Sequence, residues 1–234
     1  MAIYQKSIYC KSCEECNRKS ELFQLLTVEE TKSLNDDRFE VKFKTGENIA
    51  KQGTMLTHVV NLTSGLVKIY IEGLNDRNLL LNLIGPHSII GGPGLFTDGK
   101  FHFSINALEE TSVCFINAER FKTILDKNSV FAAAFFKHLN MKQMMLFDKL
   151  VSLTQKQMHG KLADALIYLS EKIYNSTDFE LAISRQDLAD MTAMSKDSAI
   201  RILKEFEKDG IITSKGRKIS IPKMGALKEI SWRG

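Results

Sequence analysis

The stretch SRQDLADMTAMSKDSAIRILKEFEKDG, residues 184–210 of a 234-residue chain, decides the fold. Its first four residues, Ser184-Arg185-Gln186-Asp187, have the S-x-x-D form of a capping box, which predicts the start of a helix. Thr192-Ala193-Met194 predicts a tight turn, and a second helix is predicted from Lys196 to Asp209. Gly210 ends that helix at the position that needs a left-handed backbone. Two short helices joined by a tight turn are typical of the helix-turn-helix that binds DNA.

The second helix and the segment after it carry the predicted DNA contacts. Lys196, Asp197 and Arg201 are spaced one and four apart, on one helix face. Lys or Arg can bond to guanine and Asp can accept from cytosine, so this face is predicted to read base edges. Residues 211–214 and 218–221 predict a β-hairpin, the wing. The other predicted contacts, mainly to phosphates, are at Ser184, Arg185, Gln186, Ser195, Ser198, Lys215 and Arg217.

A small helical subdomain with solvated charges would also contain two short helices. The caps, the turn, the glycine stop and the basic hairpin occur here in order, and that order favours DNA binding. The chain has a formal net charge of +4, which is compatible with nucleic acid but does not require it. Its distribution is more informative, because lysines and arginines crowd the C-terminal end.

Upstream of residue 125 the sequence predicts short strands separated by glycine-bounded turns. Residues 39–43 alternate apolar and polar side chains, the two-residue period of a half-buried strand. Further strands are predicted at 59–62, 66–71, 79–84 and 113–116. Many short strands of this kind favour a small β-barrel or roll.

The middle of the chain is predicted to be helical, with helices at 118–125, 130–153 and 156–174. The helix at 130–153 has no internal Gly or Pro and is apolar over more than one face. Phe131, Phe135 and Met145 lie on one side, and Leu139, Leu146, Leu150 and Leu153 lie around another. Such a helix needs cover from two directions. Pairing with a second copy and burial within one subunit explain the pattern equally well.

The four cysteines are Cys10, Cys13, Cys16 and Cys114. Three of them fall within seven residues, and such clustering in a reducing compartment favours metal or redox chemistry over a structural disulfide. Four thiolates are a stable tetrahedral zinc site, and redox-active thiols are an alternative. Cys114 lies in an apolar strand, where a lone buried cysteine without a function is common.

Other classes of protein lack support. No apolar run reaches the length of a bilayer span, and the N-terminus has no apolar core of a secretory signal, so a cytoplasmic location is expected. The chain contains no nucleophile elbow, no P-loop lysine motif and no zincin helix, so we expect that it is not an enzyme.

Five segments, in order and at matching spacing, resemble the Crp/Fnr superfamily of transcription regulators over nearly the whole chain. They are Lys44–Glu47 (KTGE), Ser64–Val67 (SGLV), Gly91–Phe96 (GGPGLF), Ser184–Asp187 (SRQD) and Ser195–Leu203 (SKDSAIRIL). The resemblance implies an α+β fold with an N-terminal β-roll like the cyclic-nucleotide-binding jelly roll. A long dimerisation helix and a C-terminal winged helix-turn-helix would follow the roll.

The resemblance also implies domain boundaries and partners. A cysteine-bearing segment would cover 1–20, the sensor roll 21–125, the dimerisation helix 126–155 and the winged helix 156–234. The implied protein is a homodimer that binds a palindromic operator in double-stranded DNA, with RNA polymerase as a further partner. The family's base-contacting positions fall on Lys196, Asp197 and Arg201. Lys196 stands where Arg is common in the cyclic-AMP branch, and Lys lacks the bidentate fork of Arg.

The glycine-rich segment departs from the cyclic-AMP pattern. Gly92 stands at the position of the Glu that binds ribose, and Phe101 and His102 align near the Arg-Ser pair that binds the cyclic phosphate. A phosphate needs a cation or a set of amide donors, and Phe101 offers neither. We therefore expect no cyclic-nucleotide binding. Gly91, Gly92, Phe101 and His102 are the expected effector pocket, which leaves another small or hydrophobic ligand as a candidate.

The cysteines resemble those of the oxygen-sensing Fnr branch, in which N-terminal cysteines and one distant cysteine hold a [4Fe-4S] cluster. Residues 107–114, ALEETSVC, resemble the surroundings of the distant cysteine, and the x2, x2 spacing before it suits three corners of one cubane. Fnr proper has a wider gap before its last N-terminal ligand. The candidate ligands are Cys10, Cys13, Cys16 and Cys114, and the signal would be oxygen or redox state. Zinc, haem through His87 and His102, or no cofactor with structural cysteines are the alternatives.

Overall fold

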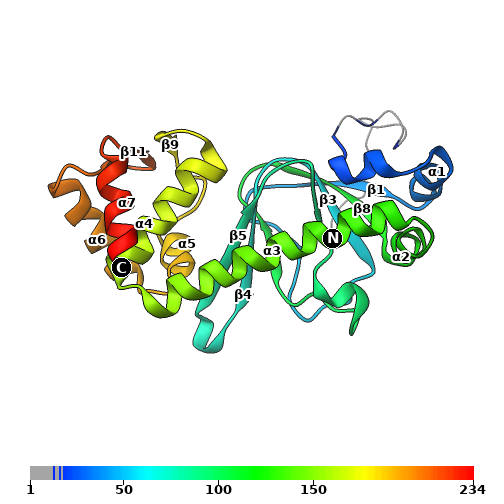
Figure 1. The fold of residues 1–234 in the computed structure, drawn as a ribbon, viewed down its shortest axis with the longest axis horizontal. Helices are drawn as coiled ribbons and strands as arrows, with labels where there is room; N and C mark the ends of the chain where they lie inside the picture. Colours follow the sequence, from blue (N-terminus) through cyan, green and yellow to red (C-terminus); the bar gives the residue numbers. More distant parts are fainter. Residues whose placement is uncertain (1–12, 14–15, 17) are drawn as a thin grey trace. The chain divides into compact units, whose positions relative to one another are not determined.

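The computed structural model describes residues 13, 16 and 18–234 (Figure 1). It divides into two compact units, residues 1–71 with 83–142 and residues 72–82 with 143–234. Cys10 lies outside the described residues. Within the described chain, no helix has both the length and the apolar character needed to cross a membrane.

The roll is built from eight strands in two four-stranded sheets. One sheet has the order β1-β8-β3-β6 and the other has the order β2-β7-β4-β5. The strands are β1 (Phe39–Phe43), β2 (Asn48–Ala50), β3 (His58–Ser64), β4 (Val67–Glu72), β5 (Asn78–Ile84), β6 (Ser88–Ile90), β7 (Ser104–Ala107) and β8 (Thr111–Asn117). Each strand predicted from periodicity is present, so the prediction of an N-terminal roll is confirmed. Strands β2, β6 and β7 are only three or four residues long and were not predicted.

Strands β3 and β8 are neighbours inside the first sheet, and nearly all of their residues are buried. Valines and leucines from β3, such as Val59 and Leu62, are completely covered. The pairing register places Cys114 of β8 opposite Glu40 of β1 and Asn61 of β3. The sheet therefore fixes the position of one of the four cysteines from both sides.

Helices precede and follow the strands of the roll in the sequence. They are η1 (Glu21–Leu25), α1 (Val28–Asp36), α2 (Ala118–Lys127) and α3 (Ser129–Gln155), with single turns η2 (Leu74–Asp76) and η3 (Pro93–Phe96). Asn128 caps α3, because its Oδ1 accepts a hydrogen bond from Phe131 N at 2.9 Å. The same side chain donates to the Leu25 carbonyl at 3.2 Å and to Glu30 at 2.9 Å. The beginning of α3 is thus tied to both η1 and α1.

The long helix α3 buries one side only at its beginning. Phe131 and Phe135 are buried against Phe121 of α2, at ring-centroid distances of 5.6 and 5.2 Å. Met145 was expected to share that side, but it is 43% exposed. Large apolar side chains cover much of the remaining surface, including Phe136, Met141, Met144, Phe147, Leu150 and Val151. One chain alone leaves these side chains in water.

The C-terminal part contains α4 (Met158–Tyr168), η4 (Leu169–Tyr174), α5 (Arg185–Met191), α6 (Lys196–Lys208) and α7 (Met224–Arg233). Its three-stranded sheet has the order β10-β11-β9, from Thr213–Lys215, Lys218–Ser220 and Asp178–Glu180. The single helix expected at 156–174 is α4 followed by a π-helical turn. That turn ends at Asn175 in a left-handed conformation, φ 47°.

Two glycines of the roll share a left-handed backbone conformation but differ in how much space surrounds them. Gly46 and Gly65 both have positive φ, at 87° and 88°, but only Gly65 is crowded. A Cβ on Gly65 would lie 2.5 Å from Thr111 Oγ1 and 2.7 Å from the Glu110 carbonyl oxygen, whereas one on Gly46 would have no neighbour within 4 Å.

We therefore expect Gly46→Ala to lower the free energy of unfolding by about 1 kcal/mol and Gly65→Ala to lower it by about 2–4 kcal/mol. Urea unfolding followed by circular dichroism measures both values. Equal losses for the two variants would show that the contact between Gly65 and β8 is not the close one described.

Candidate nucleic-acid interface and cysteine site

Helix α6 has one buried face and one exposed face. Ala199, Ile202, Leu203 and Phe206 are buried, at spacings that keep them on one side of the helix. Lys196, Asp197 and Arg201 are exposed on the other side, so the three predicted base-reading residues are available to a ligand. Ser195 caps the helix by accepting a hydrogen bond from Ser198 N at 3.1 Å.

The predicted tight turn and the predicted capping box of α5 are present. Ala193 has φ 52° in the turn between α5 and α6, and Gly210 ends α6 with φ 63°. At the start of α5, Ser184 Oγ accepts from Asp187 N at 3.0 Å, and the buried Asp187 carboxylate accepts from Ser184 N at 2.9 Å. The geometry of the helix-turn-helix is therefore set by local hydrogen bonds.

Two arginines that were predicted to contact DNA make hydrogen bonds within the protein. Arg185 Nη2 donates to Ser214 Oγ and to the Gly216 carbonyl, both at 3.0 Å. Arg217 donates from Nε to the Leu181 carbonyl and from Nη2 to the Ala182 carbonyl, both at 2.7 Å. These bonds join the wing to the start of α5 and to the segment between β9 and α5. The two arginines position the wing, whatever they also contribute to DNA binding.

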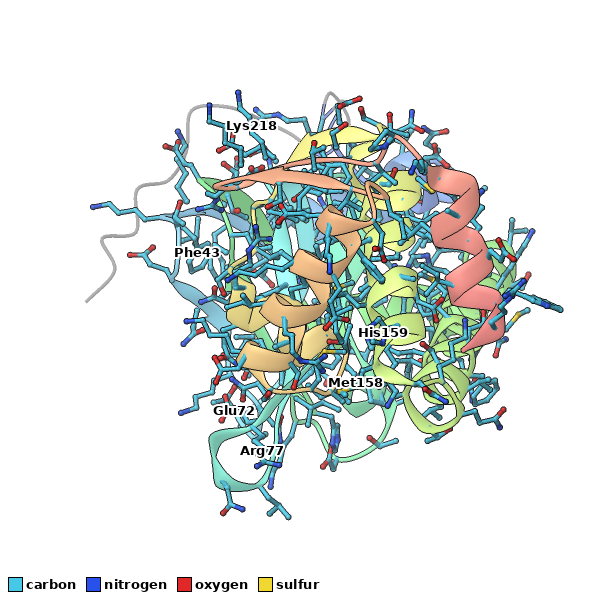
Figure 2. The ribbon with its side chains drawn as sticks, turned by 90° about the vertical axis from the view of Figure 1, so that its left-hand side faces the viewer. Phe43, Glu72, Arg77, Met158, His159 and Lys218 are labelled. Atoms are coloured by element: carbon cyan, nitrogen blue, oxygen red, sulfur yellow. The ribbon has the colours of Figure 1, made fainter. Side chains whose placement is uncertain are left out.

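Two exposed cations of the wing are lysines, one on each strand. Lys215 on β10 and Lys218 on β11 are paired in register and both are exposed. Figure 2 shows Lys218 on the wing strand. The sequence pattern predicted Lys215 as a contact but did not single out Lys218. The short side chains predicted to bind phosphate are largely engaged locally, since Gln186 Nε2 donates to Asp190 at 2.8 Å and Ser195 Oγ to Ser198 Oγ at 2.9 Å.

Arg201 is held by an acidic residue that the sequence pattern did not reveal. Its Nη1 lies 2.7 Å from Glu205 Oε1, and Glu205 Oε2 lies 2.6 Å from His159 Nε2 of α4. Hydrogen bonds from His159 and then from Arg201 lower the pKa of the Glu205 carboxyl. An ionised carboxylate only accepts hydrogen bonds, so His159 Nε2 carries the donated proton.

Aromatic rings lie beside the residues of the expected effector pocket. Phe101 is buried and packs edge-to-face on Phe103 at 6.3 Å. A Cβ on Gly92 would lie 2.9 Å from the Phe103 ring. His102 faces outward and pairs with Asp98 at 3.0 Å, and this hydrogen bond lowers the pKa of Asp98. The structure therefore places apolar rings where a bound phosphate would need donors.

Three of the four cysteines line one cavity beside the first sheet. Cys13, Cys16 and Cys114 line it together with three cations, Arg18, Lys19 and Arg38. The remaining lining residues are Phe23, Leu26, Thr31, Leu34, Glu40, Asn61, Thr63 and Ile116. The sequence separates Cys114 from the other two by about a hundred residues, and the fold brings them to the same wall.

Hydrogen bonds attach the N-terminal cysteines to the roll. Asn35 Oδ1 of α1 accepts from Cys13 N at 3.2 Å and from Arg38 Nε at 2.8 Å. Arg38 Nη1 lies 3.9 Å from Cys114 Sγ, and Lys19 Nζ donates to the Cys13 carbonyl at 3.0 Å. Asn35 and Arg38 thus connect Cys13 to Cys114, and neither residue was predicted as part of the site.

Burial governs the chemistry of these thiols. It raises the pKa of Cys114 to about 12, although the Arg38 charge acts in the opposite direction. Burial also raises the pKa of Cys13. Without a metal the Cys114 thiol is protonated at neutral pH, which disfavours it as a freely reacting redox thiol.

The described cysteines are not joined by a disulfide. Among the residues that the structure describes, no three His, Cys, Asp or Glu side chains lie close enough together to share a metal ion. The donor set is nonetheless chemically suited to a thiolate-bound metal, because three thiols share a wall with three cations that can offset thiolate charge. The Asn61 Oδ1 atom, in register opposite Cys114, is buried without a hydrogen-bond partner.

Comparisons with known proteins match both parts of the chain. Residues 40–128 match the cyclic nucleotide-binding domain family, and residues 160–230 match the Crp-like helix-turn-helix domain family. The first match covers the strands of the roll and α2. The second covers the helix-turn-helix and the wing.

Curated relatives are similar to this chain over most of their own length. The "Transcriptional activator protein anr" of Pseudomonas aeruginosa is 24% identical over 220 residues, covering 89% of this chain and 88% of that protein. The "Anaerobic regulatory protein" of Bacillus subtilis is 25% identical over 199 residues, covering 83% and 80%.

Solved structures show the same fold. FixK2 from Bradyrhizobium japonicum has a TM-score of 0.75 at 17% identity, covering 82% of this chain and 96% of that one. A regulator from Eubacterium rectale, described as putative and of the crp/fnr family, has a TM-score of 0.76 at 18% identity, covering 91% and 98%. With the roll, the long helix and the winged helix in this order, the chain belongs to the Crp/Fnr family of DNA-binding transcription regulators.

Proposed function

We propose that this regulator is a homodimer that reads a palindromic site in double-stranded DNA and responds to oxygen or redox state through an Fe–S cluster. Cys10, Cys13, Cys16 and Cys114 would hold the cluster. The observation that carries the proposal is the shared cavity wall of Cys13, Cys16 and Cys114. The relatives named as an anaerobic regulatory protein and as the activator anr support it.

The residues around the thiols have defined roles in this proposal. Arg38 and Lys19 offset the charge of the thiolates, and Asn35 keeps Cys13 close to the sheet. A bound [4Fe-4S] cluster would supply an oxygen-labile, thiolate-held charge centre at this wall. The same four thiolates also suit zinc, which is the rival occupant.

A packed route leads from the cysteine cavity to the long helix. Phe23 lines the cavity and stacks on Phe131 of α3, with ring centroids 6.2 Å apart. Asn128, the cap of α3, donates to the Leu25 carbonyl of η1. A change in how the N-terminal cysteines are held therefore reaches the start of α3 through η1. The proposed response is a population shift between two arrangements of the dimer.

The exposed apolar surface of α3 supports the second copy. Phe136, Met144, Phe147 and Val151 follow one another at spacings of eight, three and four residues, which keeps them on one helix face. All four are between 49% and 64% exposed. Helices with such a face pair in coiled-coil fashion.

Three further expectations stay predictions. They are RNA polymerase as a further partner, a cytoplasmic location, and failure to bind cyclic nucleotides.

Cys114→Ser tests the metal site. We expect wild-type protein purified without oxygen to hold about four irons and four sulfides per subunit, with a broad visible absorption band that air bleaches. Cys114→Ser should lose iron and band together, because serine is a poor cluster ligand, while Ser112→Ala, a neighbouring β8 variant, should keep both. Metal and sulfide analysis measures this. Colourless wild-type protein without iron would exclude the cluster, and stoichiometric zinc would identify the rival.

Met144→Glu combined with Phe147→Glu tests the dimer. Charges buried at a helix pair would remain unpaired, so we expect self-association to weaken by about thirtyfold or more. Sedimentation equilibrium gives the dissociation constants. Lys127→Glu, which reverses a charge at the exposed end of α2, is the control and should leave them unchanged. A double variant as dimeric as the wild type would place the interface elsewhere.

Lys218→Ala tests the wing. Loss of one phosphate contact should weaken binding to all duplexes about equally and reduce the slope of log K against log salt by about 1. Fluorescence anisotropy titrations at several salt concentrations measure the slope, with Lys127→Ala as a control outside the winged helix. An unchanged slope would mean that Lys218 does not neutralise a phosphate.

A further inference from the structure

We propose that Glu205 is a positioning residue that orients Arg201 for base reading, and that His159 holds Glu205 in place. The inference deepens the proposed function, since it rests on Arg201 as a base-reading residue. It assigns a role in DNA specificity to two residues that need not touch DNA.

Both oxygens of the Glu205 carboxylate are engaged. Oε1 accepts from Arg201 Nη1 at 2.7 Å, and Oε2 accepts from His159 Nε2 at 2.6 Å. Arg201 lies one turn before Glu205 on α6, whereas His159 lies in the first turn of α4. The His159 ring also packs edge-to-face on the buried Phe206, at 6.0 Å. Figure 2 shows His159 where α4 passes beside α6.

This arrangement is poorly explained as a contribution to folding. The three side chains are between 41% and 54% exposed, and exposed ion pairs contribute little to stability. The order also matters, because an acid N-terminal to the base is the better arrangement on a helix, and here Arg201 comes first. A pair of this kind on the recognition face is better explained by its effect on Arg201.

That effect is to restrict the Arg201 side chain. An arginine on a solvated helix loses rotamer freedom when it binds a base, and a fixed guanidinium loses less. The bond to Glu205 uses Nη1 and leaves the Nε and Nη2 edge for a bidentate contact with guanine. The hydrogen bond from His159 keeps the Glu205 carboxylate beside Arg201. It also holds this carboxylate away from the DNA phosphates, whose negative charge would repel it.

The charge of Glu205 has a second consequence. It partly neutralises Arg201, so it lowers the attraction of α6 for any phosphate backbone, irrespective of sequence. Specificity is the ratio of affinities for the preferred and the unrelated duplex. Glu205 raises that ratio on both counts, by favouring the oriented base contact and by weakening contacts that carry no sequence information.

The test uses two duplexes of equal length, one that the wild-type protein enriches from a random-sequence pool and one scrambled. We expect Glu205→Ala to lower the affinity ratio by about three- to tenfold. Affinity for the scrambled duplex should stay equal or rise. Glu205→Gln, which keeps an acceptor for Arg201, should fall between Ala and the wild type. His159→Ala should lower the ratio less than Glu205→Ala, because it acts through Glu205.

Two controls separate positioning from structure. Glu229 on α7 pairs with Arg233 at the same i, i+4 spacing but with the acid first, so Glu229→Ala removes an exposed acid–arginine pair away from α6 and should leave the ratio unchanged. In an Arg201→Ala background, Glu205→Ala should cause no further loss of the ratio, and base preference should relax only at the position that Arg201 reads.

The outcomes distinguish failure of the positioning role of Glu205 from failure of base reading by Arg201. If Arg201→Ala lowers the ratio and Glu205→Ala does not, the inference is overturned and the base-reading role stands. If Glu205→Ala lowers affinity for both duplexes in parallel, or remains fully effective without Arg201, Glu205 does not act through Arg201. If Arg201→Ala itself leaves the ratio unchanged, the proposed base reading fails and the inference fails with it.

Discussion

Burial of one face of α6 is the interaction on which the proposed DNA contact depends. Ile202, Leu203 and Phe206 are almost fully covered, and they fix the rotation of the helix about its own axis. That rotation leaves Lys196 and Arg201 facing outward. The local caps decide where the helix begins, and the buried face decides which side chains a ligand meets. The charged contacts around it, from Arg185 and Arg217 to Glu205, refine a surface that apolar packing has already oriented.

In the roll, too, the packed framework fixes one part of the site and polar contacts attach the rest. The β1-β8-β3 register fixes Cys114, and α1 brings Cys13 to it through Asn35 and Arg38. The elements that carry this cavity also cap and pack the start of α3, through Asn128 and Phe23. Sensing and dimerisation are thus proposed to meet at the first turn of one helix.

The sequence predicts those features that have local causes. Gly210 has the expected positive φ, the α5 cap and the turn at Ala193 are present, and the strands with two-residue periodicity are found. Features that depend on tertiary approach were missed. Arg185 and Arg217 find carbonyl partners about thirty residues away, and His159 meets Glu205 from 46 positions upstream. Sequence spacing does not predict such contacts, because the partners come within hydrogen-bonding distance only when the helices have packed.

Selection from a random-sequence duplex pool tests the central claim most directly, that two copies of α6 read DNA together. The pool would be presented to anaerobically prepared protein and the bound duplexes sequenced. The account predicts enrichment of an inverted repeat whose half-sites lie about one helical turn apart, roughly 34 Å centre to centre. Retention of duplexes without any enriched sequence, or enrichment of a single unrepeated half-site, would contradict it.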